Sequence, residues 1–283
     1  MAEVHHFTYG AFNPIAAYLL AFLGSFFGLL SAARARDART RGRRNRWLLI
    51  AAFAIGGGAI WLMHFAAMLG FDVPSSPIRF DMPLTMASLV FAVLTVGIGL
   101  LIVGHGRRSL PKVIAAGVLT GGGVLAMHYT GMRGLHVAGE MSYDPALVVA
   151  SVIIAVVAST VALWFAVSVR GWGPIGGAAA IMAVAVCGMH YTGMAAMSVR
   201  IDPAQTNIGG IRPLTMIVPI TVITAATIVG VALSALQAMT EEEFTDGAGT
   251  PKRGVHAGHA NPWSLKQASM AAARRPSPRP VPV

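Results

Sequence analysis

The string GMHYTGM occupies Gly188–Met194, inside one of the most apolar stretches of the chain, and nearly the same string, AMHYTGM, fills Ala126–Met132. A third, degenerate copy, MHFAAM, runs from Met63 to Met68. Each copy sets a histidine between methionines in a segment without charged residues. Ionisable side chains are expensive in lipid and usually functional there. The repetition therefore points to a role for these histidines beyond packing.

The surrounding sequence is that of an integral membrane protein. Of its 283 residues, 55% are hydrophobic and only 11% are charged, and the mean hydropathy is positive. Uncharged runs of about 20 residues are long enough to cross a bilayer as a helix. The predicted spans are residues 14–33, 47–71, 84–103, 113–132, 146–169, 174–199 and 214–238. We expect an all-α polytopic protein with seven transmembrane helices.

The net charge of +10 is explained by topology. Basic residues concentrate in the connections after the first, third and fifth spans and in the C-terminal tail, most densely in the Arg34–Arg46 loop. By the positive-inside rule these segments face the cytoplasm, which places the N-terminus outside the plasma membrane and the C-terminus inside. The Arg34–Arg46 loop then faces anionic lipid. We expect the lipid bilayer, and no nucleic acid, as the partner of this charge.

The three motifs define an internal repeat. Successive histidines, His64, His128 and His190, lie 64 and 62 residues apart, which is the length of two helices with their loops. This spacing predicts three repeated helix pairs followed by a seventh helix. Because each repeat crosses the membrane twice, all copies have the same orientation. The histidines then lie at one depth, about 10 Å below the external surface at 1.5 Å per residue, and pseudo-threefold packing brings them together.

The beginnings of the odd-numbered helices also resemble one another. They read FNP at residues 12–14, FDMP at residues 80–83 and YDP at residues 143–145. Proline is tolerated in the first turn of a helix, and Asn or Asp before it commonly caps the free amides. We therefore expect Asn13, Asp81 and Asp144 to cap three helices.

The residue types of the motif suit a soft transition metal. Within each copy the histidine and the methionine four residues later share a helix face, while the preceding methionine points about 100° away. Imidazole binds several transition metals, and thioether sulfur selects for copper, Cu(I) in particular. The absence of carboxylates from the pattern disfavours calcium, magnesium and carboxylate-bridged iron. The candidate metal ligands are Met63, His64, Met68, Met127, His128, Met132, Met189, His190 and Met194.

A structural interpretation of the motif competes with this one. Single membrane histidines often hold helices together through hydrogen bonds, and methionine is common packing material. Three copies favour a ligand site. Tyr129 and Tyr191 offer hydroxyls beside their histidines, but the first copy has Phe65 there, which excludes a mechanism that needs three tyrosines. Gly131 and Gly193 permit close helix approach.

The remaining features complete the domain organisation. The single cysteine, Cys187, excludes an internal disulfide, and although it shares a helix face with His190 we interpret it as a small packing residue. Short connections predict one membrane domain at residues 13–238 after an external N-terminus, residues 1–12. Residues 239–283 are rich in Gly, Pro, Ala and Arg and are expected to form a disordered cytoplasmic tail.

The string Met-His-Tyr-Thr, at Met127–Thr130 and Met189–Thr192 and degenerate at Met63–Ala66, resembles the signature of the MHYT family of bacterial membrane sensors. The similarity covers residues 13–238. It implies a seven-helix fold in which the nine motif residues bind copper near the outer face and sense oxygen, carbon monoxide or nitric oxide. Many members carry cytoplasmic domains that make or degrade cyclic di-GMP. Here only a short tail follows, so we expect a non-enzymatic module that signals through a partner at the Arg34–Arg46 loop or the tail.

Two other functions fit the same residues. One is transport or handling of copper or protons, although the predicted spans contain no Asp, Glu or Lys that could form a relay. The other is an intramembrane haem protein or enzyme, because His and Met serve as axial haem ligands. No nucleophile with a placed base is evident, and we predict no catalytic residue.

Overall fold

The computed structural model describes residues 4–5, 7–205 and 208–216, with isolated positions up to residue 233. Within this part, six helical spans are long and apolar enough to cross a membrane, and they correspond to the first six predicted spans. The seventh predicted span, residues 214–238, lies largely outside the described residues, as does the predicted tail. The spans are α1 (Phe12–Asp37), α2 (Arg41–Ala52) continued by η1 (Phe53–Leu62) and α3 (Met63–Met68), α4 (Met82–Gly104), α5 (Leu110–Arg133), α6 (Pro145–Ser168) and α7 (Trp172–Ala195).

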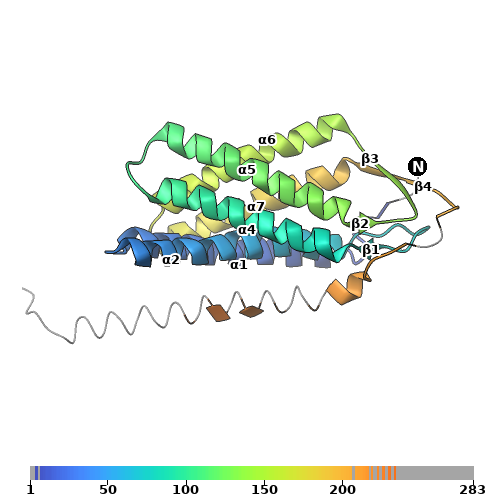
Figure 1. The fold of residues 1–283 in the computed structure, drawn as a ribbon, viewed down its shortest axis with the longest axis horizontal. Helices are drawn as coiled ribbons and strands as arrows, with labels where there is room; N and C mark the ends of the chain where they lie inside the picture. Colours follow the sequence, from blue (N-terminus) through green and yellow to red (C-terminus); the bar gives the residue numbers. More distant parts are fainter. Residues whose placement is uncertain are drawn as a thin grey trace, which may run out of the picture. The chain divides into compact units, whose positions relative to one another are not determined.

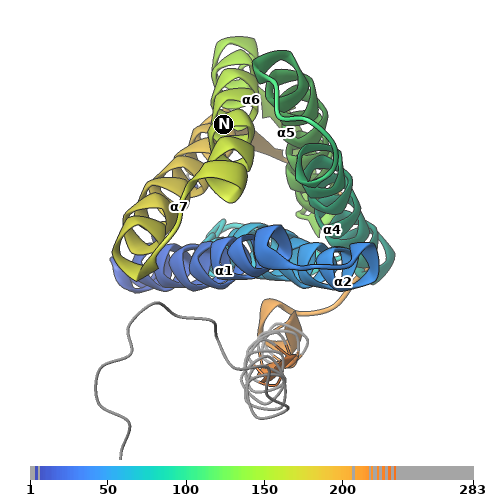
Figure 2. The same ribbon diagram turned by 90° about the vertical axis from the view of Figure 1, so that its left-hand side faces the viewer.

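The spans run lengthwise along one bundle (Figure 1), and they pack as a ring in chain order. Seen along the bundle, they form a triangle whose sides are α1 with α2, α4 with α5, and α6 with α7 (Figure 2). The ring closes where α7 packs against α1. Large apolar side chains such as Leu94, Val157 and Val184 are exposed on the outside, where a bilayer would cover them. Small residues, for example Ala17 and Ala21 of α1, are fully buried at helix contacts.

Two of the three predicted helix caps are present. The Asp81 carboxylate accepts a hydrogen bond from the Leu84 amide at 2.8 Å, and the Asp144 carboxylate accepts bonds from two amides of α6. The prediction for Asn13 is wrong, because α1 begins one residue earlier and Asn13 lies within it. Its buried side chain instead donates to the Ala66 carbonyl at 3.0 Å. A buried carbonyl on another helix thus gains a partner, and α1 is tied to the first motif.

The second span contains a π-helix that the sequence analysis did not anticipate. It covers Phe53–Leu62, ten residues with the sequence FAIGGGAIWL, directly before the first motif. Its glycines allow backbones to touch: a Cβ added at Gly56 would lie 2.7 Å from the Ala92 carbonyl oxygen of α4. The indole N–H of Trp61 donates to Thr85 O at 3.2 Å and Ser88 Oγ at 3.0 Å. These contacts fix the wide helix against α4.

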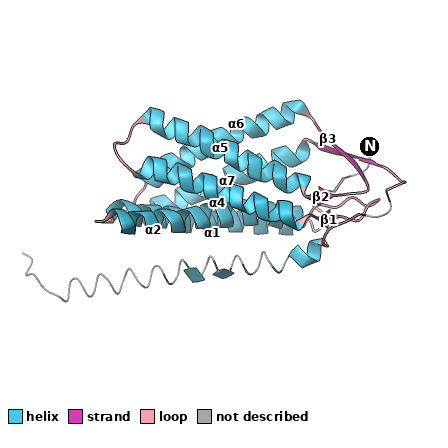
Figure 3. Cartoon of the chain, viewed as in Figure 1, coloured by secondary structure: helices cyan, strands magenta, loops and turns pink. Residues whose placement is uncertain are grey.

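Short strands join the loops at one end of the bundle (Figure 3). Strand β1 (Arg79–Phe80) pairs antiparallel with β2 (Leu135–His136), and β3 (Gly139–Tyr143) pairs antiparallel with β4 (Met197–Ile201). Phe80 also forms an isolated bridge with Ile211. The strands lie in the loops that follow α3, α5 and α7. They therefore connect the ends of the three helices that carry the motifs.

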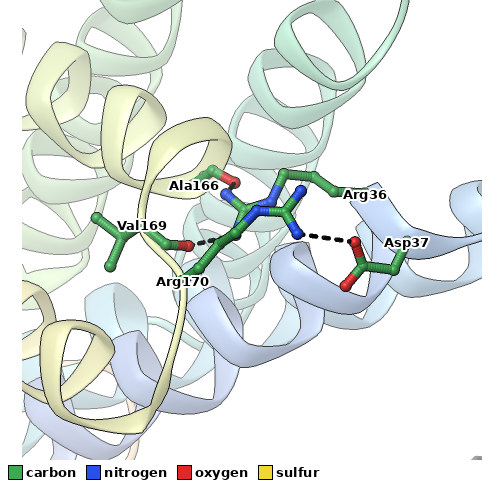
Figure 4. A network of polar contacts seen from close by, with 5 residues as sticks. All are labelled: Arg36, Asp37, Ala166, Val169 and Arg170. Atoms are coloured by element: carbon green, nitrogen blue, oxygen red, sulfur yellow. Dashed lines mark hydrogen bonds and ion pairs between the residues drawn. The ribbon is translucent and has the colours of Figure 1, made fainter. Parts of the chain in front are cut away.

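The opposite end of the bundle is basic. Arg36 of α1 donates to the carbonyls of Ala166 and Val169 at the end of α6, and Arg170 forms an exposed ion pair with Asp37 at 3.2 Å (Figure 4). A cation at a helix C-terminus satisfies free carbonyls there. The predicted Arg34–Arg46 loop is mostly helical, since only residues 38–40 separate α1 from α2. Apart from Arg39, its arginines therefore sit on two helix ends and not on a long loop.

Candidate metal centre

The three motif histidines meet in the bundle interior. His64 comes from α3, His128 from α5 and His190 from α7, and each lies within about two turns of the strand-capped end of its helix. Their exposed fractions are 0%, 0% and 1%. The Nδ1 atoms of His64 and His190 are 2.9 Å apart, and those of His128 and His64 are 3.3 Å apart. The predicted convergence of these residues is confirmed.

The arrangement of the rings suits a small cation. Their centroids are 4.9–5.3 Å apart, and the ring planes meet at 76–87°. A metal about 2.0–2.1 Å from each of three nitrogens separates them by roughly 3.3–3.6 Å, within a few tenths of an ångström of the two Nδ1 distances. A neutral imidazole carries one proton, so one ring of the His64–His190 pair donates through Nδ1 and the other accepts. A metal would take the place of that shared proton.

Glycines of the motif make room for the histidine of the preceding copy. A Cβ added at Gly131 would lie 2.5 Å from Nε2 of His64, and a Cβ at Gly193 would overlap Nε2 of His128. The Nε2 atoms of His64 and His128 are buried and form no hydrogen bond within the described part of the chain. Sequence reasoning assigned these glycines only a general packing role. Their spacing of three residues after His128 and His190 was the available signal.

Each histidine also contacts the aromatic residue that follows it. The ring centroids of His64 and Phe65, His128 and Tyr129, and His190 and Tyr191 lie 4.8–5.0 Å apart. The Tyr129 hydroxyl is 2.9 Å from Ser151 Oγ, which joins α5 to α6. In β3, burial raises the pKa of the Tyr143 phenol, and the nearby Tyr129 raises this pKa further. Tyr143 therefore remains a neutral phenol at physiological pH.

The six predicted methionine ligands are all buried, with exposed fractions of 0–3%. They belong to the hydrophobic core around the histidines, and their role as ligands stays a prediction. Cys187 is half-buried beside Met63 and Ala17. Among the described His, Cys, Asp and Glu residues, a group that could hold a metal consists of the three histidines, with candidate ligand atoms within 4.8 Å of one another.

A cavity of about 60 Å³ lies in the bundle next to the histidines. Ile60, Val124 and Val186 line it, and each precedes a motif histidine by four residues, which places it one turn away on the same helix face. All six spans contribute side chains to its wall. The other lining residues are Ser25, Ile55, Ala59, Val96, Leu100, Thr120, Ala155, Ala158, Ser159, Ala162, Leu163, Met182 and Met189.

Comparison with known sequences assigns the family. The family described as bacterial signalling protein N-terminal repeat, MHYT, matches residues 57–116, 121–177 and 184–245. The chain belongs to the MHYT family. Each matched segment holds one motif histidine and begins within the helical span that carries it. In the first two copies the MHYT unit therefore pairs that span with the following one, α4 or α6, whereas the repeat spacing predicted a pairing with the preceding helix.

Curated relatives of this MHYT chain are signalling proteins. The bifunctional diguanylate cyclase/cyclic di-GMP phosphodiesterase MucR of Pseudomonas aeruginosa is 38% identical over 78% of this chain and 34% of its own length. The cyclic di-GMP phosphodiesterase NbdA of the same organism is 34% identical over 70% of the chain and 26% of its length. Signaling protein YkoW of Bacillus subtilis is 28% identical over 70% and 25%. The chain thus spans about a quarter to a third of these relatives, and no solved structure matches it.

Proposed function

We propose that this chain is a sensory module of the plasma membrane whose histidine cluster binds copper and responds to a diatomic gas or to redox state. The observation that carries the proposal is the convergence of His64, His128 and His190, with Nδ1 atoms 2.9 and 3.3 Å apart in the buried core. Burying polar groups without full hydrogen bonding costs free energy. A bound cation would recover part of that cost.

Copper is the metal that the neighbouring chemistry favours. Buried thioethers flank every histidine in the sequence, and soft sulfur ligands select Cu(I) over harder ions. Met63, Met127 and Met189 precede the histidines, and Met68, Met132 and Met194 follow them. Three imidazoles with or without a thioether are a ligand set for copper in either oxidation state. Loss or gain of a gas ligand, or of an electron, would change the preferred geometry and so bias the helix packing.

The bundle interior between the histidines and the basic end is mostly apolar, which supports sensing over transport. An ion crossing the membrane needs polar or charged groups along its path. The cavity next to the histidines is lined by apolar side chains apart from three hydroxyls, those of Ser25, Thr120 and Ser159. This interior does not provide coordination for a copper ion leaving the histidines.

The topology proposed with this function follows the charge pattern. The seventh helix at residues 214–238 would complete a membrane domain of residues 13–238, with residues 1–12 and the strand-capped end outside. The basic end and residues 239–283 would face the cytoplasm, where the Arg34–Arg46 segment or the tail would contact a signalling partner. The cyclase and phosphodiesterase activities in the relatives' names belong to the parts of those proteins that this chain does not match.

Copper content tests the proposed function. The full chain, purified in detergent and loaded with Cu(I), is expected to retain about one copper per chain, and replacement of all three motif histidines by alanine should abolish it, because each contributes one nitrogen ligand. The matched control is His105→Ala, at the basic end of α4. X-ray absorption should show nitrogen scatterers near 2.0 Å, with sulfur if a methionine binds. Equal copper in the triple variant and the wild type would refute the proposal.

A further inference from the structure

The cavity next to the histidines approaches the lipid-facing surface between α6 and α7. A groove runs along that surface, lined by Ile153, Ile154, Val157, Ala158, Val161, Ile181, Met182 and Ala185. Ala158 and Met182 line both the groove and the cavity. The wall between bilayer and cavity is therefore one layer of side chains at this point. Met182 is unbranched and flexible, so a rotamer change there can open the wall.

The cavity suits a ligand of two or three heavy atoms. Its volume of about 60 Å³ exceeds the roughly 10–15 Å³ that one water molecule requires, but it is far below the roughly 300–1,000 Å³ of pockets for drug-sized ligands. Its mostly apolar lining disfavours ions and strongly hydrated molecules. A molecule that dissolves in lipid hydrocarbon loses little on entering.

One polar group inside the cavity lacks a partner. Ser25 of α1 lines the cavity, is 1% exposed, and its hydroxyl forms no hydrogen bond within the described residues. A buried hydroxyl without a hydrogen-bond partner destabilises the folded state. A small ligand with a weak acceptor atom would reduce that cost. Ser25 therefore indicates an occupant independently of the cavity's volume.

The cavity extends to within one helical turn of the candidate metal centre. Val186 and Met189 of α7 line it, and His190 is the residue after Met189. Ile60 and Val124 bring the same cavity within one turn, about 5.4 Å of helix rise, of His64 and His128. A molecule in the cavity thus lies about one helical turn from the imidazoles without passing through the strand-capped end.

We propose that the seam between α6 and α7 is a lateral portal through which a small, neutral, lipid-soluble molecule enters the cavity from the bilayer and reaches the histidine cluster. The proposal rests on the proposed function for the identity of the site at which this molecule acts. The portal and the cavity themselves are tested without copper. The molecule arrives already dehydrated, so its local concentration follows its partition into the membrane.

The copper-free test uses xenon, an uncharged atom that binds dry apolar cavities. Crystals of the full chain pressurised with xenon should show it enclosed by Ser25, Val124 and Met182. Ala155→Leu fills the cavity from α6 and should remove that site, and Ser159→Leu, one turn further along, serves if the first variant does not fold. Val149→Leu, on the exposed face of α6, should keep the xenon. A wild-type crystal without xenon in the cavity overturns the proposal.

The kinetic test follows carbon monoxide binding to the Cu(I)-loaded chain in lipid nanodiscs after flash photolysis. Ala185→Trp covers the groove and should slow association by about tenfold, whereas Met182→Ala thins the wall and should accelerate it. Val184→Trp is the matched control, because Val184 neighbours Ala185 but is 62% exposed and lines neither space. Equal rates in all three variants overturn the portal. A chain that binds xenon but no copper would refute the proposed function and would still support the cavity as a binding site.

Discussion

At the residue scale, the site depends on glycine as much as on histidine. The sequence predicted that His64, His128 and His190 would meet, because equal spacing along even-numbered crossings puts them at one depth. It did not predict that Gly131 would receive the ring of His64, since which copy contacts which depends on the direction in which the ring of helices closes. The first copy has Ala67 at the equivalent position, so the three contacts are unequal. Sulfur ligation by the six methionines stays a prediction.

Gly131→Ala is expected to weaken copper binding about 10-fold to 100-fold, the range seen when a metal ligand loses its supporting contacts. The added Cβ would lie 2.5 Å from Nε2 of His64, which forces that imidazole away from the other two. The measurement is a competition titration of Cu(I) against a chelator of known affinity.

The matched control for this variant is Gly122→Ala on the same helix. No atom lies within 4 Å of a Cβ added at Gly122, and alanine is favoured over glycine in a helix by up to about 1 kcal/mol. Copper affinity should therefore be unchanged in Gly122→Ala. A loss of the same size in both variants would show that the effect arises from α5 in general and not from the His64 contact.

At the scale of single elements, the sequence predicted the spans better than their internal geometry. Uncharged runs locate α1 and α4–α7 because only a helix satisfies every backbone group in lipid. The π-helix at Phe53–Leu62 carries no comparable signal, since its close contacts, with Gly24 of α1 and through Gly56 with α4, join segments distant in the sequence. Strands of two and five residues were missed for a related reason. Pairing between distant loops, and not local alternation, determines β1–β4.

Adjacent glycines of the π-helix should respond oppositely to substitution. Gly56→Ala would bring a Cβ within 2.7 Å of the Ala92 carbonyl oxygen, a backbone atom that cannot move alone, whereas a Cβ at Gly57 meets only side-chain carbons at 3.9 Å. We expect Gly56→Ala to cost about 1–3 kcal/mol, as overpacking does, and Gly57→Ala to be neutral or stabilising. Thermal unfolding in detergent, followed by tryptophan fluorescence, measures both. A more stable Gly56→Ala would contradict the close contact with α4.

At the scale of the whole molecule, the two ends of the bundle differ in kind. One end carries the strands that join the loops after α3, α5 and α7, and the histidines lie just inside it. The other end carries Arg36 and Arg170 at the C-terminus of α6. The helices are connected to one another at both ends. A conformational change at the histidines would therefore reach a partner at the basic end through the helices themselves. The sequence located these ends through its arginines, but it could not show that the loops at the histidine end form strands.

The proposed orientation of the bundle in the membrane rests on the same asymmetry and is directly measurable. In a Cys187→Ala background, Ser142→Cys places a thiol on exposed β3 and Ser109→Cys places one before α5 at the basic end, where the serine is exposed and forms no side-chain cap. Because arginine-rich ends stay in the cytoplasm, a membrane-impermeant maleimide should label Ser142→Cys in intact cells and Ser109→Cys only after permeabilisation. The two variants exchange serine for cysteine alike and serve as controls for each other. The reverse pattern would put the histidines near the inner face, where a copper site would draw on the cytoplasmic metal pool.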